Sequence, residues 1–313
     1  MADFKENIGD NILLDKKVEY SCMYDRSILR RELRSRNREQ YGILENNLPF
    51  LGYDVWNCYE FSTLTVKNQP VTAVLKLKYP CTNPYIVESK SLKLYLNSFN
   101  MSQFGSTRSE CFYLTSNIIE KDLSELLETS VSIRFFEESE ESEKSCKGEL
   151  DQRCTDISSL INLDTIDFKI FNEDPSILKV CDPGVRGRDT KPPVHRLSIK
   201  TNLMRSNCKI THQPDWGDLF IEITVKDNNI VDLESLIKYI VSFRKENHFH
   251  EEVVEMIYKR LYDLLAPEEL LVAALYTRRG GIDINPIRVN KEELLDGLNL
   301  LDMSLRHTKT LRQ

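Results

Sequence analysis

The sequence lacks a long apolar run and any excess of positive charge. Its most apolar stretch, 270–276, is far shorter than the ~20 residues that a membrane-spanning helix needs. The opening Met-Ala-Asp-Phe-Lys-Glu shows no apolar segment of a secretory signal. Lys and Arg number 42 against 49 Asp and Glu, a net charge of −7, which gives no electrostatic reason to expect nucleic-acid binding. We therefore expect a cytoplasmic protein that contacts neither a membrane nor nucleic acid directly.

Glycine-rich phosphate motifs are also absent. The eleven glycines form neither G-x-G-x-x-G nor G-x-x-x-x-G-K, so neither a Rossmann dinucleotide fold nor a P-loop is indicated. If a dinucleotide binds, other groups must hold its phosphates. The basic cluster beside glycine that could do so is Tyr276-Thr277-Arg278-Arg279-Gly280-Gly281.

Paired cysteine motifs are missing, although the chain of 313 residues contains eight cysteines. No two are spaced C-x-x-C, and none lies beside a histidine at zinc-ligand spacing. The chain is also far longer than a disulfide-stapled secreted domain. We expect most of the cysteines to be reduced thiols, buried as small hydrophobic side chains, and we expect no bound metal.

The composition, with 41% hydrophobic residues, is that of a folded globular protein. Hydrophobic periodicity predicts two strands, two helices and a strand in each half. These elements are expected at 55–66, 71–79, 88–99, 122–127 and 131–136, and again at 194–200, 219–225, 233–243, 251–265 and 270–276. The pattern S-L-x-x-Y-x-x-S-F occurs at 91–99 and recurs at 235–243. We interpret it as evidence for two tandem modules, with two unrelated amphipathic helices as the alternative.

The boundary between the modules is predicted from a run of glutamates and serines that has no apolar period. We interpret 139–156 as an acidic linker or exposed loop, so that the modules span 1–138 and 157–313. In the first module, five arginines crowd between positions 30 and 38. Such a run is typical of a solvated helix face.

Three segments contain residues suited to chemistry. In the first, Ser89 is a candidate helix N-cap, and Glu88 suits the positive end of the helix. A capped helix is one interpretation of this segment. An anion site formed by backbone N–H groups together with Lys90 is the other.

The second segment is predicted to be a polar loop between two strands, with Cys208 seven residues before Asp215 and Lys209 beside the cysteine. A nearby cation and partial exposure favour the reactive thiolate, and an aspartate within reach could move a proton. A packed cysteine and a turn-forming Pro-Asp pair form the alternative interpretation.

The third segment places two alternating histidines beside two carboxylates. His248 and His250 could be metal ligands or an acid–base pair, although no third ligand is evident. Glu251 and Glu252 could instead only complement the N-terminus of the helix that they open.

Together these segments resemble the NADPH-dependent nitrile reductases of queuosine biosynthesis, the 7-cyano-7-deazaguanine reductases. The run from Glu88 to Tyr95, Glu-Ser-Lys-Ser-Leu-Lys-Leu-Tyr, resembles the signature motif of that family. Further segments resemble its longer, two-module form: Asn47 to Phe50, Asp54 to Trp56, Cys208 to Gly217, Phe249 to Glu251, Tyr276 to Pro286 and Leu305 to Gln313. The resemblance covers nearly the whole chain except the acidic segment.

The resemblance implies an α+β fold of two tandem tunnelling-fold (T-fold) modules, with an antiparallel sheet and helices packed on one face. It implies that NADPH reduces the nitrile of 7-cyano-7-deazaguanine to the amine of 7-aminomethyl-7-deazaguanine, a four-electron reduction. Cys208 would form a covalent thioimide with the nitrile, and Asp215 would donate the proton. The other matching site residues are Val87, Glu88, Ser89, His250 and Glu251 for the substrate, and Ser89, Lys90, Arg279 and Gly280 for NADPH.

Each half keeps a motif that the other has lost, so we expect one working site between the modules. It would be completed within one chain or across a homodimer. Other T-fold enzymes, the zinc-dependent cyclohydrolases and the pterin aldolases, also hold purine-like rings with a carboxylate. A non-catalytic purine-binding protein is the third alternative. Zinc content and a mass shift after incubation with the nitrile would separate the three.

Overall fold

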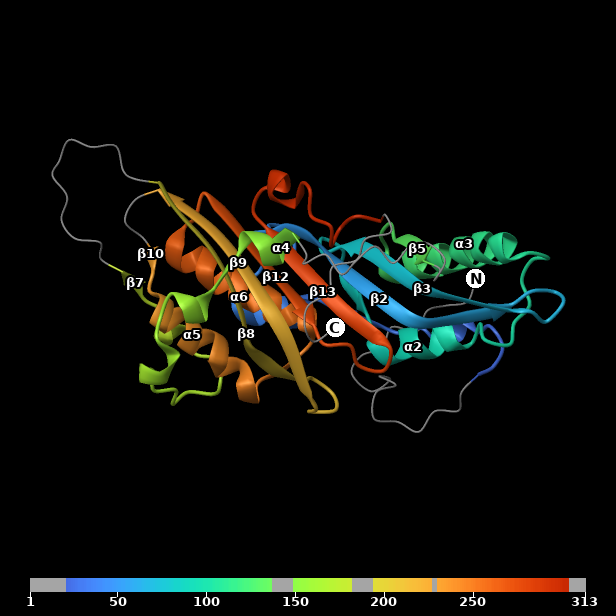
Figure 1. The fold of residues 1–313 in the computed structure, drawn as a ribbon, viewed down its shortest axis with the longest axis horizontal. Helices are drawn as coiled ribbons and strands as arrows, with labels where there is room; N and C mark the ends of the chain where they lie inside the picture. The colour runs from blue at the N-terminus through green and yellow to red at the C-terminus, as the bar shows by residue number, and fades with distance from the viewer. Residues whose placement is uncertain (1–20, 137–148, 182–193, 227–229, 304–313) are drawn as a thin grey trace.

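One nine-stranded sheet runs through the whole molecule (Figure 1). The structure is a computed structural model that describes residues 21–136, 149–181, 194–226 and 230–303. In spatial order the strands are β11 (Asn247–His248), β8 (Val194–Cys208), β9 (Pro214–Lys226), β12 (Glu269–Tyr276), β13 (Ile282–Val289), β2 (Leu51–Leu64), β3 (Pro70–Pro80) and β5 (Ser132–Phe136). The ninth strand, β6 (Thr155–Asp156), pairs with β8.

The predicted sheet was antiparallel, and the observed sheet is mixed. Both β11 and β6 pair with β8 in the parallel direction, whereas the remaining neighbours are antiparallel. The two halves of the chain join where β13 pairs with β2, in a register that places Ile284 opposite Trp56. The sheet is therefore continuous across both predicted modules.

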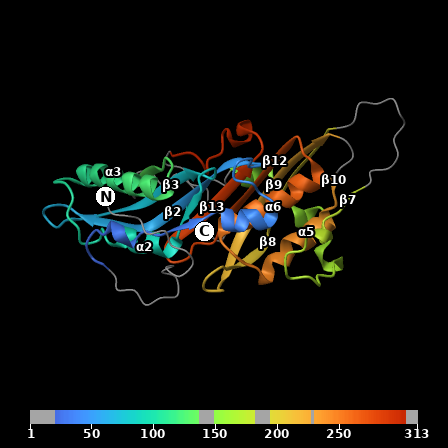
Figure 2. The ribbon, with the colours of Figure 1, turned by 180° about the vertical axis from the view of Figure 1, so that it is seen from behind.

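Four helices cover one face of the sheet: α2 (Ser89–Asn97), α3 (Arg108–Leu127), α5 (Leu233–Ser242) and α6 (His250–Leu265) (Figures 1 and 2). Side chains of β12 alternate between the two faces, so Val272 packs in the core beneath α5 and α6, while Ala273 faces the other way. That second face is covered by α4 (Glu149–Arg153) and by Leu298 and Leu300. The fold is thus α+β, as predicted.

Short elements complete the described chain. β1 (Arg31–Leu33) pairs with β4 (Tyr85–Val87), and β7 (Val180–Cys181) pairs with β10 (Ile230–Val231). The one-turn helix α1 (Ser35–Arg38) lies beside α6 (Figure 2). In the described ranges no helix is both long and apolar enough to cross a membrane.

The predicted order of two strands, two helices and a strand occurs in each half, with several shifted boundaries. α3 begins at Arg108 and not at residue 122, because its exposed first turns carry little apolar periodicity. β8 continues as far as Cys208, and β9 begins at Pro214. The segment predicted to be a polar loop is therefore mostly strand. β13 was not predicted. Gly280, Gly281 and Pro286 argue against a central strand, yet β13 is buried along its whole length.

The interpretation of the arginine run as a solvated helix face was wrong. Arg34 and Arg38 are 1% and 0% exposed. Arg34 pairs with Asp54 of β2, and Nε of Arg38 donates to Oε2 of Glu255 in α6 at 2.8 Å. These carboxylates lie 20 and 217 positions further along the chain, so no local pattern indicates them.

Part of the predicted linker lies outside the described residues. Positions 139–148 of the linker lie there. The family-like tail from residue 305 also lies outside the described residues. Residues 149–153 form α4, and residues 155 and 156 form β6 at the edge of β8.

Candidate active site

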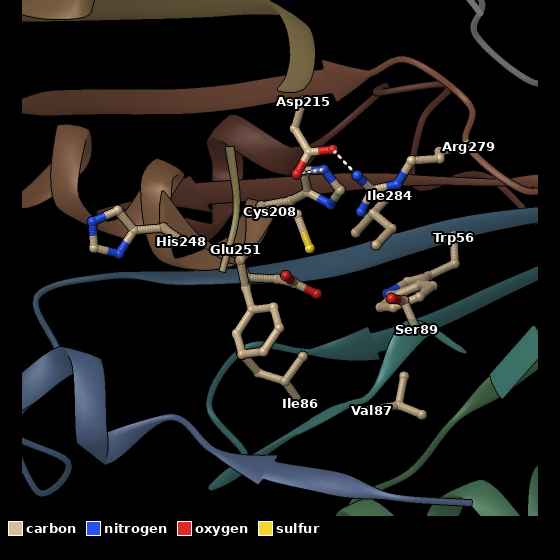
Figure 3. A pocket seen from close by; sticks show the side chains of 12 residues that line it. Trp56, Ile86, Val87, Ser89, Cys208, Asp215, His248, Glu251, Arg279 and Ile284 are labelled. Atoms are coloured by element: carbon tan, nitrogen blue, oxygen red, sulfur yellow. Dashed lines mark ion pairs between the residues drawn. The ribbon is translucent and has the colours of Figure 1, made fainter. Parts of the chain in front are cut away.

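A pocket lies where the two halves of the chain meet (Figure 3). The space between its lining atoms, part of which is open to solvent, is about 330 Å³. The first half of the chain contributes Trp56, Ile86, Val87 and Ser89, and the second half contributes Cys208, Asp215, His248, Phe249, His250, Glu251, Arg279 and Ile284. Residues of both halves therefore meet within one chain.

Cys208 is the last residue of β8 and is 4% exposed. Its backbone N–H donates to the Gln213 carbonyl at 2.8 Å, which closes the turn between β8 and β9. Burial alone would raise the pKa of the Cys208 thiol. Hydrogen bonds from Thr211, from the Ile210 N–H and from the Arg279 side chain outweigh burial, so the pKa lies below its ordinary value of 9.0. The surroundings therefore favour the nucleophilic thiolate.

The other cysteines lie in a different environment. Burial is the first cause that raises the pKa of Cys58, Cys111 and Cys181, and it raises the pKa of Cys81 to about 11 and of Cys154 to about 12. The seven cysteines in the described ranges form no disulfide. Cys22 is exposed, and among the six buried or half-buried thiols of the described ranges Cys208 is set apart by both its pKa and its place in the pocket.

Asp215 faces the pocket from β9 and contacts two other site residues. Its Oδ1 lies 2.9 Å from Nη1 of Arg279, and its Oδ2 lies 3.5 Å from Nε2 of His250. Asp215 pairs with Ser206 across the β8–β9 ladder, which places it close to the end of β8 where Cys208 lies. Arg279 therefore interacts with both the thiol and the carboxylate.

The two glutamates at the start of α6 have separate roles. Glu252 accepts the Phe249 N–H at 3.0 Å and pairs with Nζ of Lys209 at 2.7 Å, so it completes the helix N-terminus. Glu251 is turned into the pocket and is 1% exposed, and its Oε1 finds no hydrogen-bond partner in the described part of the chain (Figure 3). Burial, followed by the charge of Asp54, raises the pKa of Glu251 to about 8.

The two histidines have different surroundings. The His248 ring lies 3.2 Å from Oε2 of Glu246 and 3.5 Å from Oε2 of Glu252, in contacts that support the helix start. The His250 ring lies against Tyr276, with 3.9 Å between ring centroids, and approaches Asp215. Within the described ranges, no three His, Cys, Asp or Glu side chains are grouped so that they could hold a metal ion.

At the start of α2, Glu88 is the N-cap, and the prediction that Ser89 caps the helix was wrong. Glu88 accepts the Ser91 N–H at 2.7 Å and the Lys90 N–H at 3.2 Å. These are N–H groups that an anion site would have used. Ser89 is the first helical residue and lines the pocket together with Val87, whereas Glu88 does not line it.

The turn between β12 and β13 brings the predicted cofactor residues next to α2. The Arg279 side chain is 36% exposed and lines the pocket. Gly280 has a φ of +60°, and a Cβ added there would lie 3.2 Å from Nζ of Lys93. Gly280 and Lys90 do not line the pocket themselves. Basic side chains of both halves nevertheless lie close to this turn.

Sequence reasoning assigned no role to four residues that line the pocket: Trp56, Ile86, Phe249 and Ile284. Trp56, Phe249 and Ile284 lie inside segments that resemble the family, and this is the signal that could have identified them. Ile284 lies on β13, the strand that was not predicted.

Comparison with known proteins identifies the family. Residues 20–135 match the family described as "Nitrile reductase, 7-cyano-7-deazaguanine-reductase N-term", and residues 214–294 match "QueF-like protein". The "NADPH-dependent 7-cyano-7-deazaguanine reductase" of Colwellia psychrerythraea is 36% identical over 277 residues, 88% of this chain and 91% of the relative. The protein of the same name from Desulfotalea psychrophila is 37% identical over 295 residues, 94% of this chain and 98% of the relative. This chain belongs to the 7-cyano-7-deazaguanine reductase family.

The family predicted from the sequence is thereby confirmed. The names of its members also confirm the expected enzyme class, an oxidoreductase that depends on NADPH. A solved structure described as "Crystal structure of the archaeosine synthase QueF-Like in the apo form" matches 32% of this chain and 95% of its own, with 18% identity and a TM-score of 0.28. A TM-score this low supports no argument about the reductase fold.

Proposed function

We propose that this enzyme reduces the nitrile of 7-cyano-7-deazaguanine to a primary amine through a thioimide on Cys208, in queuosine biosynthesis. One observation carries the proposal: the thiol with the lowered pKa shares a pocket with Asp215 and with a buried, inward-facing glutamate. Family membership supports the same substrate.

In the first step the Cys208 thiol adds across the C≡N bond. Sγ bonds to the nitrile carbon, and Asp215 takes up the thiol proton and delivers a proton to the nitrile nitrogen. The product is a thioimide that contains all the atoms of thiol and nitrile. Adding sulfur makes the carbon a better hydride acceptor, so covalent catalysis divides one difficult step into easier ones. Arg279 contacts both partners in this transfer.

NADPH, when bound, supplies one hydride per molecule, and two molecules account for the four electrons. The residues that would hold it are Ser89, Lys90, Arg279 and Gly280. The donor chemistry fits, because guanidinium and ammonium groups suit phosphates, and Arg279 is half-exposed at the pocket. The positive φ of Gly280 allows the turn beside Lys93 to form without strain.

Glu251 and His250, with Val87, Glu88 and Ser89, are proposed to bind the deazaguanine. An ionised carboxylate accepts paired N–H donors, and the 2-amino edge of such a ring presents two of them. Oε1 of Glu251 is buried without a partner in the described chain, as expected for an atom that a ligand satisfies. Because Glu88 is bound to its own helix and does not line the pocket, its contribution would be to position Ser89 at the start of α2.

We further propose that the chain consists of two tandem T-fold modules, 1–138 and 157–313, joined by the segment 139–156, and that it forms a homodimer. The recurrence of two long strands followed by two helices in each half supports the modules. The site would be completed within one chain, since both halves already line one pocket. Sedimentation of the purified enzyme tests the homodimer.

NADPH oxidation with 7-cyano-7-deazaguanine tests the function. We expect two NADPH oxidised per nitrile by the wild type and none by Cys208→Ala. Cys181→Ala, a half-buried cysteine outside the pocket, is the matched control and should keep its activity. Without NADPH, mass spectrometry should find the nitrile attached at Cys208. Turnover by Cys208→Ala, or a wild type that consumes no NADPH, would refute the assigned mechanism.

A further inference from the structure

Trp56 lies at the centre of the sheet and reaches the pocket from β2. Trp56 is only 1% exposed. It pairs with Ile284 of β13, which also lines the pocket. Its rings pack in the core with Leu77 and Tyr95. The Nε1–H group is buried, and the described residues offer it no hydrogen-bond acceptor.

Packing explains the rings of Trp56 but not its N–H group. A buried donor without a partner costs free energy, and a buried Trp N–H usually finds an acceptor. Figure 3 shows the indole of Trp56 and the carboxylate of Glu251 turned toward one another across the pocket, with the sulfur of Cys208 close to the carboxylate. A donor and an acceptor thus face the same space without partners, beside the nucleophile.

We propose that Trp56 is a substrate-binding residue whose indole N–H donates a hydrogen bond to a carbonyl oxygen or ring nitrogen of the bound heterocycle. The identity of the heterocycle rests on the proposed function. Glu251 and Trp56 then recognise opposite features, because an ionised carboxylate only accepts and an indole only donates. A deazaguanine ring presents both donors and acceptors at its edges, whereas a ring without an acceptor leaves Trp56 unsatisfied. Trp56 therefore contributes to specificity.

Calorimetric titration with 7-cyano-7-deazaguanine tests this inference. Cys208→Ala protein binds without forming the thioimide, and Trp56→Phe is introduced into that background, which removes the N–H and keeps an aromatic ring. We expect the dissociation constant to rise about tenfold, the effect of losing one buried hydrogen bond. The matched control is Trp216→Phe, since the Trp216 ring packs under the guanidinium of Arg244 and lies outside the pocket. It should bind as the parent does.

Fluorescence provides a second measurement that keeps native Trp56. Trp216→Phe leaves Trp56 as the single tryptophan, and its emission should change when the nitrile binds. Equal affinity of the Trp56→Phe protein, or loss of NADPH affinity instead of nitrile affinity, would overturn the inference alone. Unchanged Trp56 emission on binding would do the same. A parent protein that does not bind the nitrile would overturn the proposed function as well.

Discussion

Nη1 of Arg279 lies 2.9 Å from Oδ1 of Asp215, and the same guanidinium helps to lower the pKa of Cys208. From the sequence, Arg279 was expected only to contact NADPH. In the structure it also contacts both residues proposed to form the thioimide. One side chain therefore links the proposed cofactor site to the reactivity of the thiol.

Arg279→Gln should slow alkylation of Cys208 by iodoacetamide several-fold at neutral pH and move the pH profile upward. Losing the guanidinium removes a stabiliser of the thiolate. The other charged or titratable groups around the thiol are Asp215 from β9, His248 from β11, His250 and Glu251 from α6, and Lys209 from the turn.

Arg279→Lys keeps the charge and should recover part of the rate. Arg278→Gln is the matched control, because Arg278 lies over the Tyr59 ring at 4.5 Å and does not line the pocket. Its profile should equal that of the wild type. An unchanged profile in Arg279→Gln would restrict Arg279 to cofactor binding.

Nitrile binding near pH 7 should release a proton from Glu251. Burial raises the pKa of this carboxyl from 4.5 to about 8, so it is largely protonated in the free enzyme at pH 7. A ring edge with paired N–H donors needs the ionised form. Affinity should therefore increase as the pH rises toward 8. Calorimetry of Cys208→Ala protein in buffers of different ionisation enthalpy measures the release.

In Glu251→Gln this proton release should vanish, and binding should weaken. The variant should also be more stable relative to the wild type as the pH rises. A raised carboxyl pKa stabilises the fold fully below pH 4.5, and that contribution is lost between 4.5 and about 8. Proton uptake on binding, or release that persists in Glu251→Gln, would contradict the assignment.

A buried ionic cluster behind Glu251 holds the two halves of the chain together. Nη1 of Arg288 lies 2.8 Å from Oδ1 of Asp54, and its Nη2 lies 2.8 Å from Oε1 of Glu255. Arg34 and Arg38 contact the same two carboxylates from the N-terminal segment. Three guanidiniums share two carboxylates, so each of these carboxylates balances more than one buried charge.

Glu255→Gln should therefore lower the free energy of unfolding by about 3–5 kcal/mol at neutral pH, since it leaves buried arginines uncompensated. Despite burial, the charges of Arg38 and Arg288 lower the pKa of Glu255 from 4.5 to about 2. A lowered carboxyl pKa stabilises the fold above pH 4.5, and that contribution is lost as the pH falls toward 2.

Denaturant unfolding at several pH values measures this effect, and the gap between wild type and Glu255→Gln should narrow below pH 4.5. Glu234→Gln is the matched control, because the Glu234 side chain is half-exposed and forms its ion pair with Lys238 one helical turn away. Its loss should stay below about 0.5 kcal/mol. A similar loss of unfolding free energy in both variants would show that the buried cluster stabilises the fold no more than an exposed ion pair does.

The strands and helices with clear periodicity could be predicted from the sequence. The family-like motifs indicated several residues that line the pocket, among them Cys208, Asp215 and His250. The burial of Arg34 could not, because its partner Asp54 comes together with it only in the folded chain. Ser89 was preferred over Glu88 as N-cap because serine caps are common, yet the Glu88 carboxylate reaches both free N–H groups. Hydrophobic periodicity predicts only that Trp56 is a core residue. That its N–H group has no partner among the described residues is seen only in the folded structure.

Mixing two inactive variants should restore no activity if one chain completes each site. Cys208→Ala removes the nucleophile of the second half, and Lys90→Ala alters α2 of the first half. Ser89 at the start of α2 and Cys208 line one pocket of a single chain. A mixed dimer would therefore contain one damaged site in each chain and no intact one. The measurement is NADPH oxidation after the chains are unfolded together and refolded, with wild type treated in the same way as the control. Recovery of about a quarter of the wild-type rate, the statistical yield of one intact site in half of the dimers, would show instead that the sites form across chains.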